Sequence, residues 1–195
     1  FKQKTAYEIS TRDWSSDVCS SDLHAANSAA TIRHPAARFD MVRVGIALYG
    51  IAPSITMRGD CSFLRPALSL RSRVSFVKRV AAGEGISYGL RHRFARATNV
   101  ATVPLGYADG VPRQLGTLGG EVLIRGRRRP IVGVVTMDQL MVDCGDDEVR
   151  VDDEVVLIGA QGDETIDANE WGELMGTIGY EVVCSISARV PRVIV

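Results

Sequence analysis

The pattern of apolar and polar positions changes along the chain, and the change falls near Leu64. Beyond this residue, short segments rich in valine and isoleucine are separated by Gly or Pro, which is typical of an antiparallel β domain. Turns are expected at Gly83-Glu84-Gly85 and at Gly119-Gly120, where glycine tolerates a positive φ. The expected strands cover residues 67–80, 99–105, 121–125, 131–144 and 154–158.

The end of the chain predicts two short helices. Asp167 followed three residues later by Glu170 resembles a capping box, so a helix is expected to begin there and to be interrupted at Gly176. A second short helix is expected over 180–187, and a strand over 189–195.

Before Leu64 the pattern indicates a helix followed by a strand. Residues 25–33 predict a short helix that opens just after Asn27-Ser28. Residues 39–49 form an apolar run, broken by a charged residue and a glycine, that predicts a buried parallel strand. A helix followed by a strand is typical of the last part of a TIM-type α/β barrel. Such a remnant cannot close into a barrel by itself.

Residues 1–23 fit neither pattern. They show no helical or strand periodicity, and they lack the apolar stretch and cleavage site of a targeting peptide. Back-translation of Phe1 to Ile9 and of Trp14 to Leu23 reproduces the two ends of a sequencing-library adapter. We therefore interpret the segment as non-native and expect it to be disordered, with the gene continuing upstream of His24. The alternative is a native, disordered polar tail.

The expected fold class is an α/β-barrel remnant followed by a mainly antiparallel β domain with short C-terminal helices. The expected parts are the adapter-like segment 1–23, the barrel remnant 24–51, a linker 52–65 and the β domain 66–195.

Charge and composition limit the classes of partner that the chain can bind. The chain has 23 basic and 23 acidic residues. Residues 1–23 hold three of the basic and four of the acidic residues, so 20 basic and 19 acidic residues remain without them. This balance argues against a nucleic-acid partner. The local exception is a run of four arginines, Arg125 and 127–129, whose flanking Gly126 and Pro130 indicate a solvated hairpin tip.

Cysteine usage and hydropathy fit a cytoplasmic protein. Cys61, Cys144 and Cys184 are widely spaced and match neither a metal-ligand nor a disulfide pattern, so no metal site is expected. The longest apolar runs are of strand length and far too short for a membrane span.

Candidate chemistry begins in the first region. Asn27-Ser28 and Gly45-Ile46 have the residue types that hold a phosphate group by hydroxyl and backbone N–H groups. The alternatives are an ordinary turn pair and a glycine at a tight strand crossing. Arg43 stands in an otherwise apolar run, where its charge needs a partner; a structural ion pair is the alternative.

Five segments, taken in order, resemble the C-terminal part of alanine racemase. They are His24-Ala25-Ala26-Asn27-Ser28, Arg43-Val44-Gly45-Ile46-Ala47-Leu48-Tyr49-Gly50, Ser87-Tyr88-Gly89, Gly106-Tyr107-Ala108-Asp109-Gly110 and Met137-Asp138-Gln139. The resemblance covers His24 to Val195. It implies a fold-type III enzyme that uses pyridoxal 5'-phosphate to interconvert L-alanine and D-alanine, the latter for peptidoglycan.

The resemblance also implies roles for residues of the first region. Asn27, Ser28, Gly45 and Ile46 would contact the cofactor phosphate. Arg43 would donate to the pyridine nitrogen, and because an arginine does not release its proton, the ring would stay a weaker electron sink.

Residues of the β domain would complete the site of a partner subunit. Tyr88 would be the catalytic tyrosine that moves the α-proton on one face, and the backbone N–H of Met137 would contact the substrate carboxylate. Tyr107, Asp109 and Arg113 would shape the access corridor. A homodimer with head-to-tail shared active sites is therefore implied. By themselves, a Tyr-Gly pair and a methionine are more often packing residues.

Two departures from the family pattern qualify these roles. Ala188 stands where many members have a tyrosine that helps bind the phosphate. The lysine that binds the cofactor covalently belongs to barrel strands that this sequence lacks, and Lys78 does not replace it. We expect the chain alone to be inactive. A broad-specificity amino-acid racemase and a non-catalytic β-domain interaction module remain alternatives.

Overall fold

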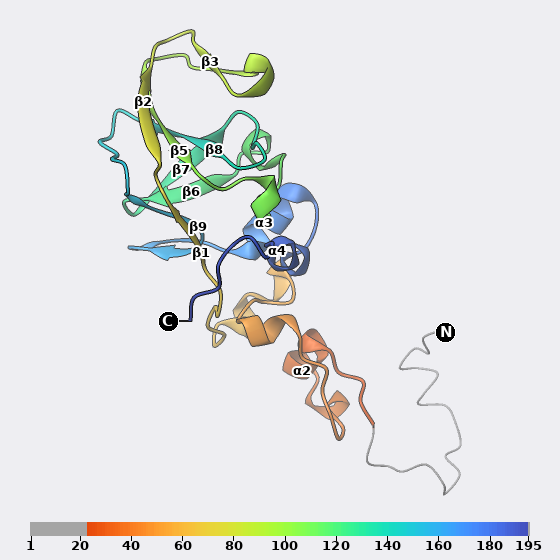
Figure 1. Cartoon of the computed structure of the whole chain (residues 1–195). Coiled ribbons are helices and arrows are strands. Elements are labelled where there is room, and N and C mark those ends of the chain that lie inside the picture. Colours follow the sequence, from red (N-terminus) through yellow and green to blue (C-terminus); the bar gives the residue numbers. More distant parts are fainter. Residues whose placement is uncertain (1–22, 195) are drawn as a thin grey trace, which may run out of the picture. The chain divides into compact units, whose positions relative to one another are not determined.

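A computed structural model describes residues 23–194, which divide into two compact units (Figure 1). The first unit extends to Arg65 and the second begins at Pro66. The adapter-like interpretation of residues 1–23 falls almost entirely outside the described residues.

The first unit contains one α-helix and several 3-10 turns. Helix α2, Ser28–Arg33, is capped by Asn27, whose side-chain oxygen accepts the N–H of Ala30 at 3.0 Å. The cap explains why the helix begins at Ser28, within the predicted range. The 3-10 helices are Pro35–Ala37, Ile46–Tyr49, Ile55–Met57 and Gly59–Cys61.

The strand predicted over 39–49 is wrong. Within this segment only Arg43 takes part in a bridge, an isolated parallel pair with Asn27, and the chain then turns into the 3-10 helix Ile46–Tyr49. A parallel strand is stable when it has hydrogen-bonded neighbours along its length, and the described residues supply a partner at one position only.

The second unit is built on an antiparallel sheet, and this confirms the predicted β domain. Its strand order is β1-β9-β6-β7-β8-β5-β2, with β10 paired to β9. A separate two-stranded sheet joins β3, Gly85–Ile86, to β4, His92–Arg93. The strands of the large sheet are β1 Leu70–Arg73, β2 Phe76–Val80, β5 Thr98–Val103, β6 Glu121–Ile124, β7 Arg127–Val132, β8 Leu140–Gly145, β9 Glu154–Gln161 and β10 Glu164–Ile166.

Two of the predicted strands are each divided in the structure. The segment 67–80 breaks between β1 and β2, where Val74 donates to the carbonyl of Asp153 and Ser75 to that of Thr102, both at 2.9 Å. Because β1 and β2 stand at opposite ends of the strand order, this break carries the chain from one edge to the other and the sheet is curled. The segment 131–144 divides at Gly133, whose φ is 75°.

The two C-terminal helices are confirmed. Helix α3, Ala168–Met175, is capped by Asp167, which accepts the N–H of Glu170 at 2.8 Å, and it ends at Gly176 with φ 67°. Helix α4 covers Gly179–Ser185.

The strand predicted over 189–195 is wrong for its described part. Residues 188–190 form a turn and 191–194 have no regular structure. The carbonyl groups of Ile186, Ser187 and Val190 accept hydrogen bonds from the Arg192 guanidinium, so this segment is held by a side chain instead of a strand neighbour.

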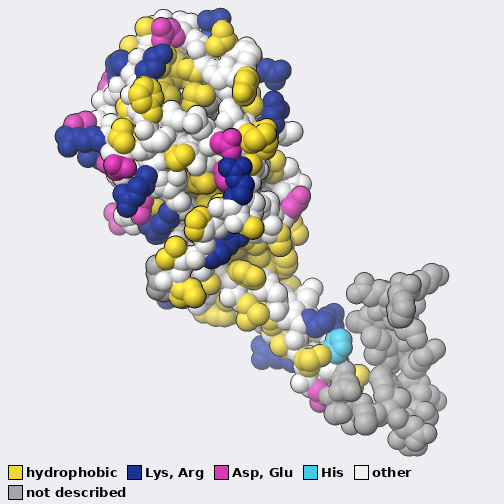
Figure 2. Space-filling view, in the orientation of Figure 1, with side chains coloured by type: hydrophobic (Ala, Val, Ile, Leu, Met, Phe, Trp, Pro, Cys, Tyr) yellow, Lys and Arg dark blue, Asp and Glu magenta, His cyan; other side chains and the backbone are white. Residues whose placement is uncertain are grey.

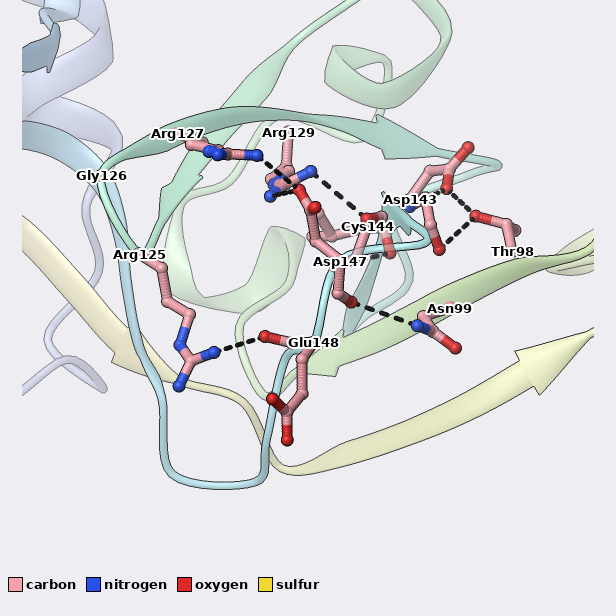
Figure 3. A network of polar contacts seen from close by, with 12 residues as sticks. Thr98, Asn99, Arg125, Gly126, Arg127, Arg129, Asp143, Cys144, Asp147 and Glu148 are labelled. Atoms are coloured by element: carbon pink, nitrogen blue, oxygen red, sulfur yellow. Dashed lines mark hydrogen bonds and ion pairs between the residues drawn. The ribbon is translucent and has the colours of Figure 1, made fainter.

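The arginine run is only partly the solvated tip that the sequence suggested. Arg125 and Gly126 form the β6–β7 turn, with φ of 54° and 71°. Arg129, however, is mostly buried and pairs with Asp147 (Figure 3). The hydrogen bond from Arg129 holds the pKa of the Asp147 carboxyl below its ordinary value. The arginines of β7 therefore bind neighbouring acidic residues of the same unit.

The apolar core of the second unit draws its buried side chains mainly from the strands of the large sheet and from α3. Its fully buried members include Val122, Leu123, Leu140, Leu157 and Trp171. A smaller cluster of Val80, Phe94, Val100 and Val132 packs against Ile86, which anchors the base of the β3–β4 pair.

Candidate functional site

The first unit brings together the residues of the candidate phosphate site. The hydroxyl of Ser28, a buried residue at the start of α2, accepts the N–H of Gly45 at 3.0 Å. Gly45 directly precedes the 3-10 helix that begins at Ile46, so two helix starts meet here. An added Cβ at Gly45 would have no atom within 4 Å, which leaves its backbone open to a ligand.

Arg43 is tied to this cluster by its backbone, which forms a bridge with Asn27. Its N–H donates to the carbonyl of Ala26 at 2.7 Å. The guanidinium lies 2.7 Å from His24 Nδ1 and donates to the carbonyls of His24 and Ala25. In residues 23–194 no carboxylate pairs with it, so the ion-pair alternative finds no partner there. The side chain is also exposed and not inside a strand.

The second unit gathers the other candidate residues around one loop. This β7–β8 loop, residues 133–139, connects β7 to β8. The Ser87 hydroxyl donates to the carbonyl of Val134 at 2.8 Å and accepts the Val134 N–H at 3.1 Å. The loop thereby holds the Tyr88 turn, residues 87–90, whose Tyr88 side chain is 72% exposed.

The same loop holds the Tyr107 turn, residues 106–110. Tyr107 donates its N–H to the Thr136 carbonyl at 2.9 Å, and Ala108 donates to the Met137 carbonyl at 3.0 Å. The buried carboxylate of Asp109 accepts the N–H of Gly106 at 2.9 Å. Asp109 therefore stabilises the turn from within, whereas Tyr107 and Arg113 are exposed.

Met137 lies at the tip of the β7–β8 loop with its side chain half exposed. Among the described residues, its N–H donates to no protein acceptor. A backbone N–H without a protein acceptor, on an exposed residue, suits the binding of a carboxylate.

In comparisons with known proteins, each of the two units is matched by a different family domain. A family model described as "Alanine racemase, C-terminal domain" matches residues 67–194, and one described as "Alanine racemase, N-terminal domain" matches residues 16–53. The chain belongs to the alanine racemase family. A curated alanine racemase from Symbiobacterium thermophilum is 55% identical over 170 residues, and one from Carboxydothermus hydrogenoformans is 51% identical over 173 residues.

Solved structures of the family agree with this assignment. The crystal structure of alanine racemase from Bacillus anthracis with bound L-Ala-P matches with 49% identity and a TM-score of 0.80, over 87% of this chain and 44% of that chain. The Streptomyces lavendulae alanine racemase matches with 43% identity and a TM-score of 0.82, over 87% and 44% of the respective chains. The chain spans 45% of the Symbiobacterium relative's length and 47% of the Carboxydothermus relative's.

Sequence reasoning missed the arginine that joins the Tyr107 turn to the β7–β8 loop. Arg189 pairs with Asp138 at 2.7 Å and lies 3.3 Å from the Asp109 carboxylate. It thus links the Tyr107 turn to the β7–β8 loop, and the hydrogen bond to Asp138 raises the pKa of Arg189 above its ordinary value. Asp138 belongs to the Met137-Asp138-Gln139 motif and Arg189 to the predicted C-terminal strand, but neither pattern indicates that the two residues pair across 51 positions.

Two residues that mark departures from the family pattern are both exposed. Ala188 lies in the turn after α4, and Lys78 lies on β2, where its side chain faces solvent.

Residues 23–194 contain no group of His, Cys, Asp and Glu side chains arranged to bind a metal ion. No helix among them has the length and apolar character to cross a membrane. On the visible face of the second unit, basic and acidic side chains are interspersed (Figure 2).

Proposed function

We propose that this chain is the C-terminal part of a pyridoxal-phosphate-dependent alanine racemase that interconverts L-alanine and D-alanine. The observation that carries the proposal is the β7–β8 loop. This one loop holds the turn of the proton-transfer residue Tyr88 and the turn of the corridor residue Tyr107, and it presents the N–H of Met137 expected to bind the substrate carboxylate. A cytoplasmic location and a role in peptidoglycan supply belong to the same proposal.

The donor groups of the first unit suit the cofactor. The Ser28 hydroxyl accepts the Gly45 N–H and keeps its own hydrogen to donate, and together with the backbone N–H of Ile46 it provides neutral donors for a phosphate, beside the permanent charge of Arg43. Asn27 fixes the start of α2 next to them. When bound, the cofactor withdraws electron density from the substrate Cα, which makes its proton removable.

The residues of the second unit then have distinct tasks. The Tyr88 phenol removes or returns the α-proton on one face of Cα, while a base outside this chain serves the other face. The Met137 N–H holds the substrate carboxylate, and Tyr107 and Arg113 limit access to small substrates such as alanine. We further propose a head-to-tail homodimer in which these groups complete the site of the partner subunit.

The test is to replace Tyr88 by Phe in the full-length protein that contains this chain. Loss of the phenol oxygen should lower kcat by about a hundredfold or more, because one of two proton-transfer groups is removed. Exchange of the α-proton with deuterated solvent should persist for one alanine enantiomer and be lost for the other. Both rates are measurable by NMR.

The matched control is Tyr107→Phe, the same chemical change on the neighbouring turn. It should alter KM more than kcat and leave exchange symmetric between the enantiomers. Equal kcat losses in the two variants would contradict the assignment of Tyr88.

The alternatives have their own readouts. A panel of amino acids would reveal a broad-specificity racemase through comparable kcat/KM values for substrates larger than alanine. A full-length protein without any racemase activity would favour the non-catalytic interaction module. The 195-residue chain alone is expected to show no turnover, because the cofactor-binding lysine of the family has no counterpart in it.

A further inference from the structure

The backbone that presents Tyr88 is strained. Ser87 has φ 63° and ψ 178°, a combination that is almost restricted to glycine. Within the same turn, Gly89 and Leu90 also have positive φ values, 73° and 47°. A non-glycine residue keeps such a conformation only where surrounding contacts enforce it.

The enforcing contact is the pair of hydrogen bonds between Ser87 and Val134. One hydroxyl both donates to the carbonyl and accepts the N–H of the same residue, which fixes the Ser87 side chain in two directions. Close approach is possible because Gly133 lacks a side chain: a Cβ there would lie 2.7 Å from Ser87 Cβ. We call this pair of bonds the Ser87–Val134 clasp.

The clasp fixes the Tyr88 turn to the β7–β8 loop. On the N-terminal side of Ser87, Ile86 packs against the small core cluster and pairs with His92 in the β3–β4 sheet. On the C-terminal side, the Tyr88 phenol has no hydrogen-bond partner among the described residues. The direction in which Tyr88 leaves the fold therefore depends on the backbone angles of Ser87.

Val134 also lies three positions before Met137 in the β7–β8 loop. The clasp consequently ties the turn of the proton-transfer tyrosine to the loop that presents the carboxylate-binding N–H.

We propose that Ser87 is a positioning residue, which sets the placement of Tyr88 relative to Met137 through the Ser87–Val134 clasp. The proposal rests on the proposed racemase function for its kinetic consequence. A small misplacement of a proton-transfer group lowers the rate strongly even when substrate binding is retained. Ser87 therefore acts on kcat and less on KM.

Two substitutions in the full-length protein separate positioning from stability. Ser87→Ala removes the hydroxyl and keeps the strained φ, whereas Ser87→Gly removes the hydroxyl and relieves the strain. S87G should accordingly have a higher Tm than S87A. Both should lower kcat by about tenfold or more while KM changes by less than about threefold.

The matched control is Ser75→Ala. Its hydroxyl also donates to a backbone carbonyl, that of Thr102, at the junction of β1 and β2. This variant should retain kcat and KM. If kcat in S87A and S87G instead follows Tm, so that S87G recovers activity to within about twofold of the unaltered protein, Ser87 is merely structural and the proposal is overturned.

Hydrogen exchange provides a readout that does not depend on turnover. The backbone N–H of Val134 should exchange about tenfold faster or more in both Ser87 variants. The N–H of Leu90, which donates to the Ser87 carbonyl at 3.1 Å, should follow, with no change in S75A. If the unaltered full-length protein fails to racemise alanine, the proposed function fails. Unchanged exchange at Val134 and Leu90 in the Ser87 variants overturns the positioning role in either case.

Discussion

Gly106 is the residue at which the Tyr107 turn comes closest to the β7–β8 loop. A Cβ at this position would lie 2.3 Å from the carbonyl oxygens of both Thr136 and Met137. The φ of Gly106 is −142°, which any residue adopts, so the requirement for glycine here is space and not conformation. The close approach allows Tyr107 and Ala108 to donate to these two carbonyls.

We expect Gly106→Ala to push the Tyr107 turn away from the loop. The N–H groups of Tyr107 and Ala108 should exchange faster with solvent, and overpacking should cost about 1–3 kcal/mol of unfolding free energy. Hydrogen exchange and urea unfolding measure the two effects. Gly59→Ala is the control, since a Cβ there meets nothing within 4 Å; slow exchange at Tyr107 in both variants would refute the argument.

Motifs in the sequence predicted which residues are brought together but not what holds them. Tyr88, Tyr107 and Met137 were identified from short segments, and the structure connects all three to one loop. Ser87 and Val134 are 47 positions apart, so their clasp depends on tertiary contact that spacing does not reveal. The assigned roles stay predictions until the substitutions are made.

At the scale of elements, Arg128 connects three parts of the second unit. From β7 its guanidinium contacts Glu121 of β6 at 3.0 Å, Glu164 of β10 at 3.0 Å and Glu170 of α3 at 2.7 Å. These side chains are about one-third to one-half exposed, so the charges are partly removed from water. The hydrogen bond with Glu170 raises the pKa of Arg128 further above its ordinary value.

Arg128→Ala should therefore destabilise the second unit by about 1–3 kcal/mol, because three neighbouring carboxylates would be left without their common partner. Arg127→Ala is the matched control on the same strand. Its side chain is 69% exposed and pairs with Asp147 at 3.1 Å, so the loss should stay below about 1 kcal/mol. Urea unfolding gives both values, and equal losses would show that the Arg128 cluster contributes no more than a surface pair.

Element ends that are set by adjacent residues were predicted well, whereas ends that are set by distant partners were not. The cap at Asp167 and the helix end at Gly176 are properties of a few adjacent residues, and both were found where expected. The break at Val74 and Ser75 is set by carbonyls of Asp153 and Thr102, far along the chain. Such a break leaves the apolar pattern of a single strand intact.

At the scale of the whole molecule, the two units differ in how much apolar surface they bury. Among the described residues of the first unit, the buried apolar side chains are Ala26, Ile46, Met57 and Cys61. The second unit holds the remaining core, which spans most of its sheet and both α-helices. Because apolar burial is the main stabilising contribution, the first unit should unfold more easily.

Each unit carries a buried cysteine that reports on its own unfolding. Cys61 lies in the 3-10 helix Gly59–Cys61, and Cys144 lies on β8, where burial raises the pKa of the thiol to about 11. Both thiols should resist alkylation at pH 8 in the folded chain, since the thiolate is the reactive form. The exposed Cys184 should react at once.

We expect a pulse of iodoacetamide at increasing urea to modify Cys61 at a lower urea concentration than Cys144, with peptide mass spectrometry identifying each site. Two midpoints would show that the first unit opens while the sheet remains folded. Cys184→Ser serves as the control, because removing an exposed thiol should shift neither midpoint. A single shared midpoint for Cys61 and Cys144 would mean that the units unfold together, and that the larger core stabilises the residues of the candidate phosphate site as well as its own.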